Sequence, residues 1–196
     1  GRLYASWSDA HHVFFSTSSD QGSHWSSAVA VNAAPAITAI FPWLAAYNGA
    51  VDLVYYGTTA ASKDDPSATW NVYLAQTTNG GASFTQNVVS NTPNHHGVIC
   101  TNGTGCAAGT RNLLDLFEVA IDPLNGKAGI IYTDIARDGT QSGPNLWSTE
   151  AVAKAVGAPM VKRDGLIPTP PCCGRRARSY ASSVSGSRWD SWYEMI

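Results

Sequence analysis

Two octapeptides decide the fold that this sequence predicts: Ser18-Ser19-Asp20-Gln21-Gly22-Ser23-His24-Trp25 and Thr77-Thr78-Asn79-Gly80-Gly81-Ala82-Ser83-Phe84. Both have a hydroxyl residue first, Asp or Asn third, Gly fifth and an aromatic residue eighth. An Asp or Asn side chain can hold a tight turn by accepting backbone N–H groups, and Gly permits a positive φ. We expect the aromatic residue to pack under the next strand and fix the turn to the core.

A second repeat consists of Asn-Gly turns. Asn48-Gly49 and Asn125-Gly126 each separate two apolar runs. Asn-Gly between such runs is the strongest short-range signal for a β-hairpin. Each repeat therefore predicts a hairpin, a third strand, the octapeptide turn and a fourth strand.

The octapeptides resemble the Asp box of the sialidase-like, BNR-repeat β-propellers. The first is a full match, and the second has Asn79 where Asp is usual. The resemblance covers roughly residues 2–150. It implies an all-β fold, a partial β-propeller with about two and a half to three four-stranded antiparallel blades.

The strand spacing divides the chain into two regions. Residues 1–151 are predicted to hold the blades, and 152–196 an irregular or poorly ordered tail. The blades are a partial one at 2–31, a full one at 37–90 with strands 37–46, 50–56, 70–76 and 84–90, and a partial one at 113–151 with strands 113–121, 127–134 and 145–151. Propellers close with roughly 4–8 blades, so we expect a fragment of a longer protein or one part of an assembly.

The composition of the tail changes abruptly, becoming Pro-rich at 168–171 and then Arg-rich. An interaction tail, a disordered end and a shifted reading frame all account for it, and we favour the last two. Adjacent Cys172 and Cys173 stay unexplained.

Composition bounds the function. The 196 residues carry a net charge of −2 with only 13% charged residues, which argues against a nucleic-acid partner. No apolar run approaches the roughly 20 residues of a membrane span. Few Lys and many small polar residues favour an extracellular or secreted protein. No signal-peptide pattern is present. The sequence opens with Gly1 inside a stretch that resembles a strand, so we expect the natural start upstream of it.

Two further cysteines bracket a loop rich in Gly, Asn and Thr. We predict a small disulfide between Cys100 and Cys106, with two free thiols as the alternative. Neither a Cys-x-x-Cys spacing nor a matched His pair accompanies them, so no metal is expected. No cofactor motif occurs either.

Candidate functional residues gather in the long loops expected on one face of the blades, at 32–36, 57–69, 91–112 and 134–144. Binding roles are predicted for His95, His96, Arg111 and Arg137. The same loops hold Asp64, Asp65, Asp134 and Asp138, of which Asp64, Asp65 and Asp138 fit turns better than chemistry. On the expected innermost strand of the third blade, Glu118 and Asp115 are the weak candidates for a catalytic carboxyl group, with a water-facing structural role as the alternative.

Three functions are compatible with these features. Sialidases bind the substrate carboxylate through arginines, one of them in a Phe/Tyr-Arg-Ile-Pro motif that is absent here, so no sialidase catalytic residue is transferred. We therefore favour an extracellular, non-catalytic propeller segment with a binding or structural role. The alternatives are a fragment of a sialidase-like glycoside hydrolase and a subunit of a structure assembled through open strand edges. The expected partners are a carbohydrate ligand and the remaining blades or other copies of the chain.

Overall fold

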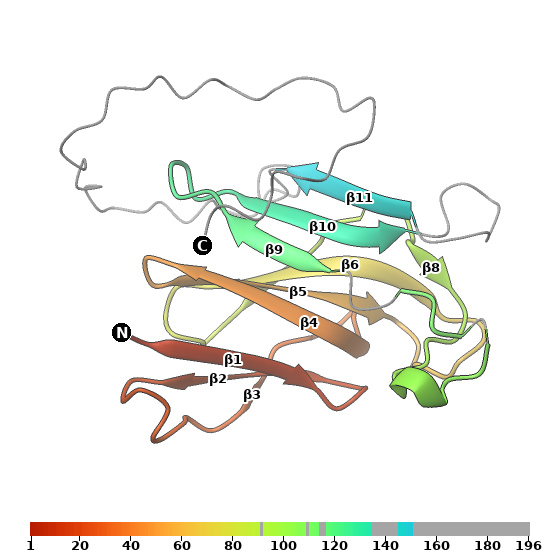
Figure 1. Ribbon diagram of the computed structural model, residues 1–196, viewed down its shortest axis with the longest axis horizontal. Coiled ribbons are helices and arrows are strands. Elements are labelled where there is room, and N and C mark those ends of the chain that lie inside the picture. The colour runs from red at the N-terminus through yellow and green to blue at the C-terminus, as the bar shows by residue number, and fades with distance from the viewer. Residues whose placement is uncertain (91, 109, 114–116, 135–144, 151–196) are drawn as a thin grey trace. The chain divides into compact units, whose positions relative to one another are not determined.

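Antiparallel sheets build the described part of this chain. The computed structural model describes residues 1–90, 92–108, 110–113 and 117–134, and the backbone of 145–150. No α-helix occurs within these ranges. All strand pairings in them are antiparallel and form three sheets (Figure 1).

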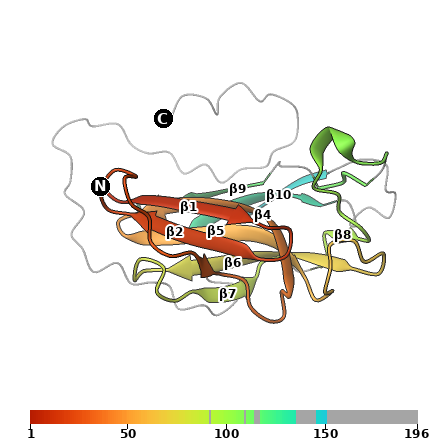
Figure 2. The same cartoon turned by 90° about the horizontal axis from the view of Figure 1, so that it is seen from below.

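The three sheets follow one another along the chain (Figures 1 and 2). The first has the order β1 (Leu3–Ser8), β2 (Val13–Ser18), β3 (Val29–Ala30). The second, central sheet has the order β4 (Thr38–Tyr47), β5 (Ala50–Thr58), β6 (Thr69–Thr77), β7 (Thr85–Val88), with the short β8 (His95–His96) also paired to β6. The third has the order β11 (Asn145–Glu150), β10 (Ala128–Asp134), β9 (Glu118–Ile121), and a 3₁₀ turn, η1 (Gly103–Gly105), precedes it.

The central strand β5 is buried along its whole length. Leu53 and Tyr55 belong to a hydrophobic cluster shared with Phe15 of the first sheet. Val54 and Tyr56 belong to a second cluster, shared with residues of β9 and β10. Successive strand residues point to opposite faces, so the apolar run from Leu53 to Tyr56 supplies two cores. The central sheet thus lies between the other two.

The edge strand β4 is interrupted by a bulge. Its pairing with β5 shifts register between Ile40 and Trp43, and Phe41 has φ of 51°. Pro42 lies inside this interruption, where the missing N–H costs no ladder hydrogen bond. The bulge explains how a proline fits within a ten-residue strand.

The first octapeptide forms a turn held by its own side chains. Ser18 Oγ donates to Asp20 Oδ1 at 2.8 Å and accepts the Gly22 N–H at 2.9 Å. Asp20 Oδ1 also accepts the His24 N–H at 2.9 Å. Gly22 has φ of 91°, which a residue with a Cβ rarely adopts.

The second octapeptide repeats these hydrogen bonds. Thr77 Oγ1 donates to Asn79 Oδ1 at 2.8 Å and accepts the Gly81 N–H at 3.1 Å. Asn79 Oδ1 accepts the Ser83 N–H at 3.1 Å, and Gly81 has φ of 90°. An amide therefore replaces the carboxylate without changing the turn.

The aromatic residues that close the two octapeptides lie in unlike surroundings. The ring of Phe84 meets that of Phe15 edge-on, with centroids 5.2 Å apart. The side chain of Trp25 is 45% exposed. The expectation that both pack under the next strand is therefore wrong for Trp25, because no other sheet of the described ranges covers it, whereas the first sheet covers Phe84.

The two Asn-Gly turns also differ. Asn48 and Gly49 have φ of 49° and 81° and close a two-residue hairpin, with Tyr47 paired to Ala50. The second turn is wider: Asp122 N–H donates to the Lys127 carbonyl at 2.8 Å. Pro123 has no N–H to continue the ladder, so β9 ends at Ile121.

Other boundaries depart from the predicted ones where loops take part in pairing. Residues 91–112 are predicted as one long loop but contain β8 and η1. The strand predicted over 113–121 is observed only from Glu118, and residues 114–116 are outside the described ranges. The arrangement of the three sheets as propeller blades, and the division of the chain at 151, stay predictions.

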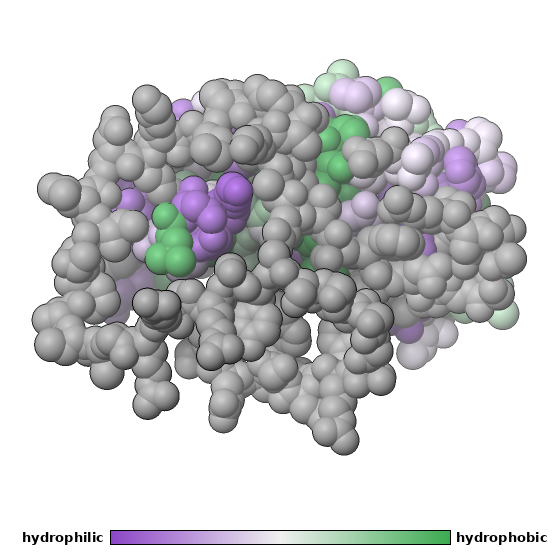
Figure 3. Space-filling view, turned by 90° about the horizontal axis from the view of Figure 1, so that it is seen from above, coloured by the Kyte–Doolittle hydropathy of each residue, from purple (hydrophilic) through white to green (hydrophobic). Residues whose placement is uncertain are grey.

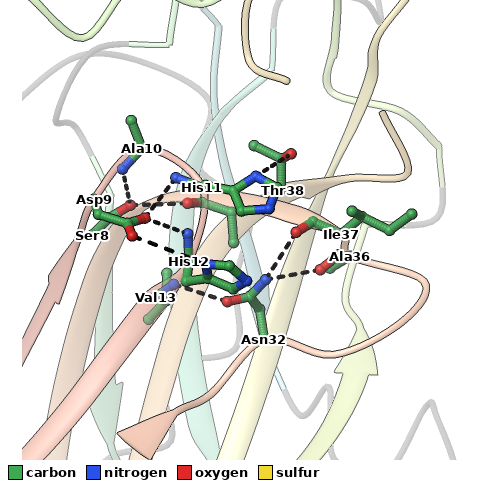
Figure 4. A network of polar contacts seen from close by, with 11 residues as sticks. Ser8, Asp9, Ala10, His11, His12, Val13, Asn32, Ala36, Ile37 and Thr38 are labelled. Carbon is green, nitrogen blue, oxygen red and sulfur yellow. Dashed lines mark hydrogen bonds and ion pairs between the residues drawn. The ribbon is translucent and has the colours of Figure 1, made fainter. Parts of the chain in front are cut away.

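A polar network fastens the β1–β2 turn to the central sheet (Figure 4). Asp9 Oδ1 accepts the N–H groups of His11 and His12 at 2.9 and 2.6 Å. The His11 Nδ1 lies 3.1 Å from Thr38 Oγ1. Asn32 accepts the Val13 N–H at 2.8 Å. These contacts satisfy loop backbone that would otherwise be left without partners.

Apolar side chains reach the surface singly. On the face that Figure 3 shows, hydrophobic and hydrophilic residues of the described ranges lie side by side. The most exposed large apolar side chain is Leu124, at 78%, in the turn after β9. Scattered exposure of this kind is ordinary for a folded protein.

Acid is expected to weaken the first octapeptide turn selectively. Hydrogen bonds from the His24 backbone and ring and from Ser18 hold the pKa of Asp20 below its ordinary value. A carboxyl group with a lowered pKa in the folded state stabilises the fold above its unfolded pKa, and that contribution disappears as the pH falls. Thermal unfolding of the wild type and Asp20→Asn should therefore converge as the pH falls below about 4, the unfolded-state pKa of an aspartate. Asn79 shows that an amide can make the same turn, so parallel pH profiles for the two proteins would contradict this.

Candidate functional site

A buried polar cluster lies where β10 ends. Thr133 and Asp134, its last two residues, are each 1% exposed. The Thr133 N–H donates to the Tyr56 hydroxyl at 3.0 Å, and the Thr133 carbonyl accepts from Asn94 Nδ2 at 3.1 Å. Backbone groups that would extend a sheet ladder are thus bonded to side chains of the central sheet and of the loop after β7.

Tyr56 is held rigidly in this cluster. Its ring stacks on Phe117, with centroids 4.4 Å apart and planes at 23°. Burial raises the pKa of Tyr56 well above its ordinary value, and the nearby Tyr132 and Asp134 add smaller effects in the same direction. The phenol is therefore neutral at pH 7 and accepts a hydrogen bond with its oxygen.

Asn94 and His95 continue the cluster. Burial lowers the pKa of His95, which favours the neutral imidazole near pH 7. Its Nε2 lies 3.3 Å from the Val98 carbonyl. A carbonyl only accepts, so we assign the ring proton to Nε2. His95 Nδ1 and Asn94 Oδ1 are then two buried acceptors that have no hydrogen-bond partner among the described residues. Unpaired buried acceptors are costly and mark a place where a donor fits.

The strand β8 separates the two neighbouring histidines. His95 pairs with Trp70 and His96 with Thr69 on β6. Adjacent strand residues face opposite sides, so His95 is buried and His96 is exposed. Such a pair cannot direct both rings to one ligand.

The disulfide lies in the loop that follows β8. Cys100 and Cys106 are bonded, and their Cα atoms are 5.8 Å apart. The Cys100 N–H donates to the Thr110 carbonyl at 2.9 Å, which draws the two ends of the small loop together. Arg111, just beyond this loop, is exposed.

The remaining predicted residues are not gathered at the cluster. Glu118 is exposed on β9, next to the buried Val119. Asp64 forms an ion pair with Lys63 at 2.7 Å, and Asp65 accepts from the Ser67 backbone and hydroxyl. The others lie outside the described ranges: Asp115, Arg137, Asp138, Cys172 and Cys173.

The described ranges hold neither a cluster of metal ligands nor a membrane-spanning helix. They contain no group of three or more His, Cys, Asp or Glu residues that could hold a metal. They also contain no helix that could cross a membrane.

Sequence reasoning did not identify Tyr56, Asn94 or Thr133 as site residues. Tyr56 sits in an apolar run, Asn94 follows a proline and Thr133 ends an apolar strand, so each has an ordinary structural role in the pattern. Only the pairing of distant segments brings them together: 77 positions separate Tyr56 from Thr133.

Comparison with known proteins locates a family likeness in the C-terminal half. A family model described as "Histidine biosynthesis protein" matches residues 104–166, about a third of the chain. Among curated proteins, the 1-(5-phosphoribosyl)-5-((5-phosphoribosylamino)methylideneamino) imidazole-4-carboxamide isomerase of Paracoccus denitrificans is 44% identical over 76 residues, which are 38% of this chain and 31% of that protein.

The isomerases of the same name from two other bacteria are also similar. That of Trichlorobacter lovleyi is 38% identical over 73 residues, covering 36% of this chain and 30% of the relative. That of Citrifermentans bemidjiense is 48% identical over 42 residues, covering 21% and 17%. The chain thus spans less than a third of the length of these relatives.

These matches correct several predictions from the sequence. The assignment to the sialidase-like, BNR-repeat family is wrong, because the matched proteins are isomerases of histidine biosynthesis. The extracellular binding or structural role is wrong with it, as are its glycosidase and self-assembly alternatives. Three more predictions are wrong for the same reason: the secreted location, the carbohydrate ligand, and the remaining blades or other copies as partners.

The physical cause of the error is that turn chemistry and composition were interpreted as family traits. Small polar residues and Asp or Asn turns are required by tight β-turns in any protein. The matched relatives are a TIM-barrel family, in which strands run parallel. The described strands pair antiparallel, and the first two sheets up to β8 precede the matched segment.

Proposed function

We propose that the segment from residue 104 to residue 166 takes part in the isomerisation of a phosphoribosyl imidazole-carboxamide, as in the relatives that it resembles. The observation that supports this most is the buried carboxyl group of Asp134 at the end of β10, inside the matched segment. Enzymes built on β-strands commonly place reacting groups where a strand ends and its loop begins.

Isomerisation requires a group that moves protons. The reaction rearranges hydrogen within one molecule and neither adds nor removes atoms, so a general acid and base suffice in principle. A positioned carboxyl group contributes roughly 10²–10⁴-fold to such steps. We propose Asp134 as that group. The strand end that carries it is fixed by the Thr133 N–H, which donates to Tyr56, and by the Thr133 carbonyl, which accepts from Asn94.

The sequence after Asp134 suits a phosphorylated substrate. Three positions after Asp134 comes Arg137, and it is followed by the run Asp138-Gly139-Thr140-Gln141-Ser142-Gly143. Guanidinium groups bind phosphate through paired hydrogen bonds, and segments rich in Gly, Ser and Thr supply backbone and hydroxyl donors. The relatives' substrate carries phosphoribosyl groups, and this composition would match them.

The test is turnover of that substrate by the purified chain. The two isomers have equal mass, so product is followed by chromatographic separation. We expect conversion by the wild type and a loss of about 10²–10⁴-fold in kcat for Asp134→Asn. Circular dichroism establishes that the variant is folded.

The matched control is Asp52→Asn. Asp52 is also a buried strand aspartate, 3% exposed, and accepts from Gln76 Nε2 at 2.9 Å, but it lies outside the matched segment. We expect its kcat to stay within about threefold of the wild type. No conversion by the wild type, or equal loss in the two variants, would overturn the proposal.

A further inference from the structure

A second candidate site is a cleft. It lies at the end of the described sheets that is opposite to the end where β10 stops. A cleft of about 580 Å³ opens between the start of β1, the β4–β5 turn and the β6–β7 turn. Arg2, Tyr4, Tyr47, Asn48 and Gly80 are among its lining residues. This volume lies within the roughly 300–1,000 Å³ of small-molecule sites. All of its lining residues precede the segment that resembles the isomerases.

Arg2 gives the cleft a positive charge that no described group neutralises. Its side chain is exposed, and no carboxylate of the described ranges lies within ion-pair distance of it. The residues that line the cleft include neither Asp nor Glu. Among the described residues, no acidic side chain competes with an anion from solution for this guanidinium.

The guanidinium is positioned by a glycine. A Cβ added to Gly80 would lie 2.7 Å from Arg2 Nη1, so the absence of a side chain lets the guanidinium rest against the β6–β7 turn. The side-chain amide of the neighbouring Asn79 donates within the turn, to Ser83 Oγ at 2.8 Å. The wall beside Arg2 is accordingly a fixed turn.

The rings of Tyr4 and Tyr47 and the turn residue Asn48 complete the lining. Tyr4 stacks on the core residue Phe15, with centroids 5.9 Å apart. Tyr47 is 37% exposed at the end of β4. Asn48 follows in the β4–β5 turn with φ of 49°. A flat ring can lie against such tyrosines while an anion meets the guanidinium.

We propose that this cleft binds a small aromatic oxyanion, an aryl carboxylate or aryl phosphate. Arg2 donates two parallel N–H bonds to two oxygens of the anion, and the ring of the ligand packs on Tyr4 and Tyr47. The fork of a guanidinium matches both anions, and it is less strongly hydrated than an ammonium group.

Calorimetric titration with benzoate, phenyl phosphate and neutral benzyl alcohol tests this. The chain is used with any tag at its C-terminus, so that the surroundings of Arg2 are unchanged. We expect one or both anions to bind and benzyl alcohol to bind at least about tenfold more weakly. Whichever of benzoate and phenyl phosphate binds more tightly identifies the class of anion, carboxylate or phosphate, that the cleft prefers.

Variants separate a specific site from general attraction. Arg2→Gln should weaken binding at least about tenfold, and Arg2→Lys by less, because a lysine keeps the charge and loses the fork. Lys127→Gln removes a positive charge in the β9–β10 turn, outside the cleft, and should change nothing. Equal binding by wild type and Arg2→Gln, equal binding of benzyl alcohol, or no binding of either anion at about 10 mM would overturn the proposal. Isomerase activity plays no part in these readouts.

Discussion

Replacing Trp70 by alanine is expected to lower the free energy of unfolding by about 3–5 kcal/mol, enough to unfold many domains of this size. Trp70 is 0% exposed and belongs to the cluster between the central and third sheets. Its Nε1 donates to the Gly97 carbonyl at 2.9 Å. The substitution opens a cavity and also removes the donor that the Gly97 carbonyl accepts from. Urea unfolding followed by circular dichroism measures the loss.

Trp43→Ala is the matched control. Trp43 lies on β4 of the same sheet, but its side chain is 48% exposed. Truncation there removes little buried area, and we expect a change within about 1 kcal/mol. A loss in Trp70→Ala no larger than that in Trp43→Ala would mean that the second cluster does not hold these sheets together.

The second large effect is expected for Gly81→Ala, a loss of about 2–4 kcal/mol. The added Cβ would overlap Cε1 of Phe15, a core side chain that is 1% exposed. The backbone at Gly81 also has φ of 90°, which strains any residue with a Cβ. Steric overlap and backbone strain therefore act together, and the midpoint of thermal unfolding reports their sum.

Gly49→Ala isolates the strain. Gly49 has φ of 81°, but nothing lies within 4 Å of the added Cβ. We expect about 1 kcal/mol from the backbone alone. Should Gly81→Ala cost no more than Gly49→Ala, then Phe15 moves aside freely and the packing of the first sheet on the octapeptide turn is not tight.

Local patterns carry most of the secondary structure. A strand is predicted over 50–56, and β5 covers Ala50–Thr58, because an apolar run that begins after Asn-Gly has few other conformations. The hydroxyl, Asp or Asn, and Gly positions of the octapeptides likewise make the hydrogen bonds that their chemistry suggests. Patterns of this kind depend on residues that are neighbours in the chain.

Features that depend on distant segments were not predictable in the same way. Nothing within the octapeptides distinguishes the exposed Trp25 from the packed Phe84, since the difference lies in which sheet covers each. His95 and His96 form one pair in the sequence, and the pairing of β8 with β6 assigns them to opposite faces. The polar cluster around Thr133 joins three segments of the chain and has no local signature.

The likeness to isomerases was missed for a different reason. The residues after Asp134 contain Asp138-Gly139, which the turn rules account for fully. An ordinary turn and a phosphate-binding loop use the same small and polar residues. Composition alone does not distinguish the two, whereas the likeness to the isomerases rests on matches over 42 to 76 residues.

Burial of β5 on both sides has a consequence for how this strand finds its orientation. Because apolar residues lie on both faces of β5, hydrophobicity alone does not determine which face points to which core. Its adjacent phenols do: Tyr55 donates to Gln86 on one side, and Tyr56 accepts from Thr133 on the other. If the two faces of β5 were exchanged, both hydroxyl groups would be buried among apolar side chains without these partners. The two tyrosines therefore specify which face of the strand points to which core.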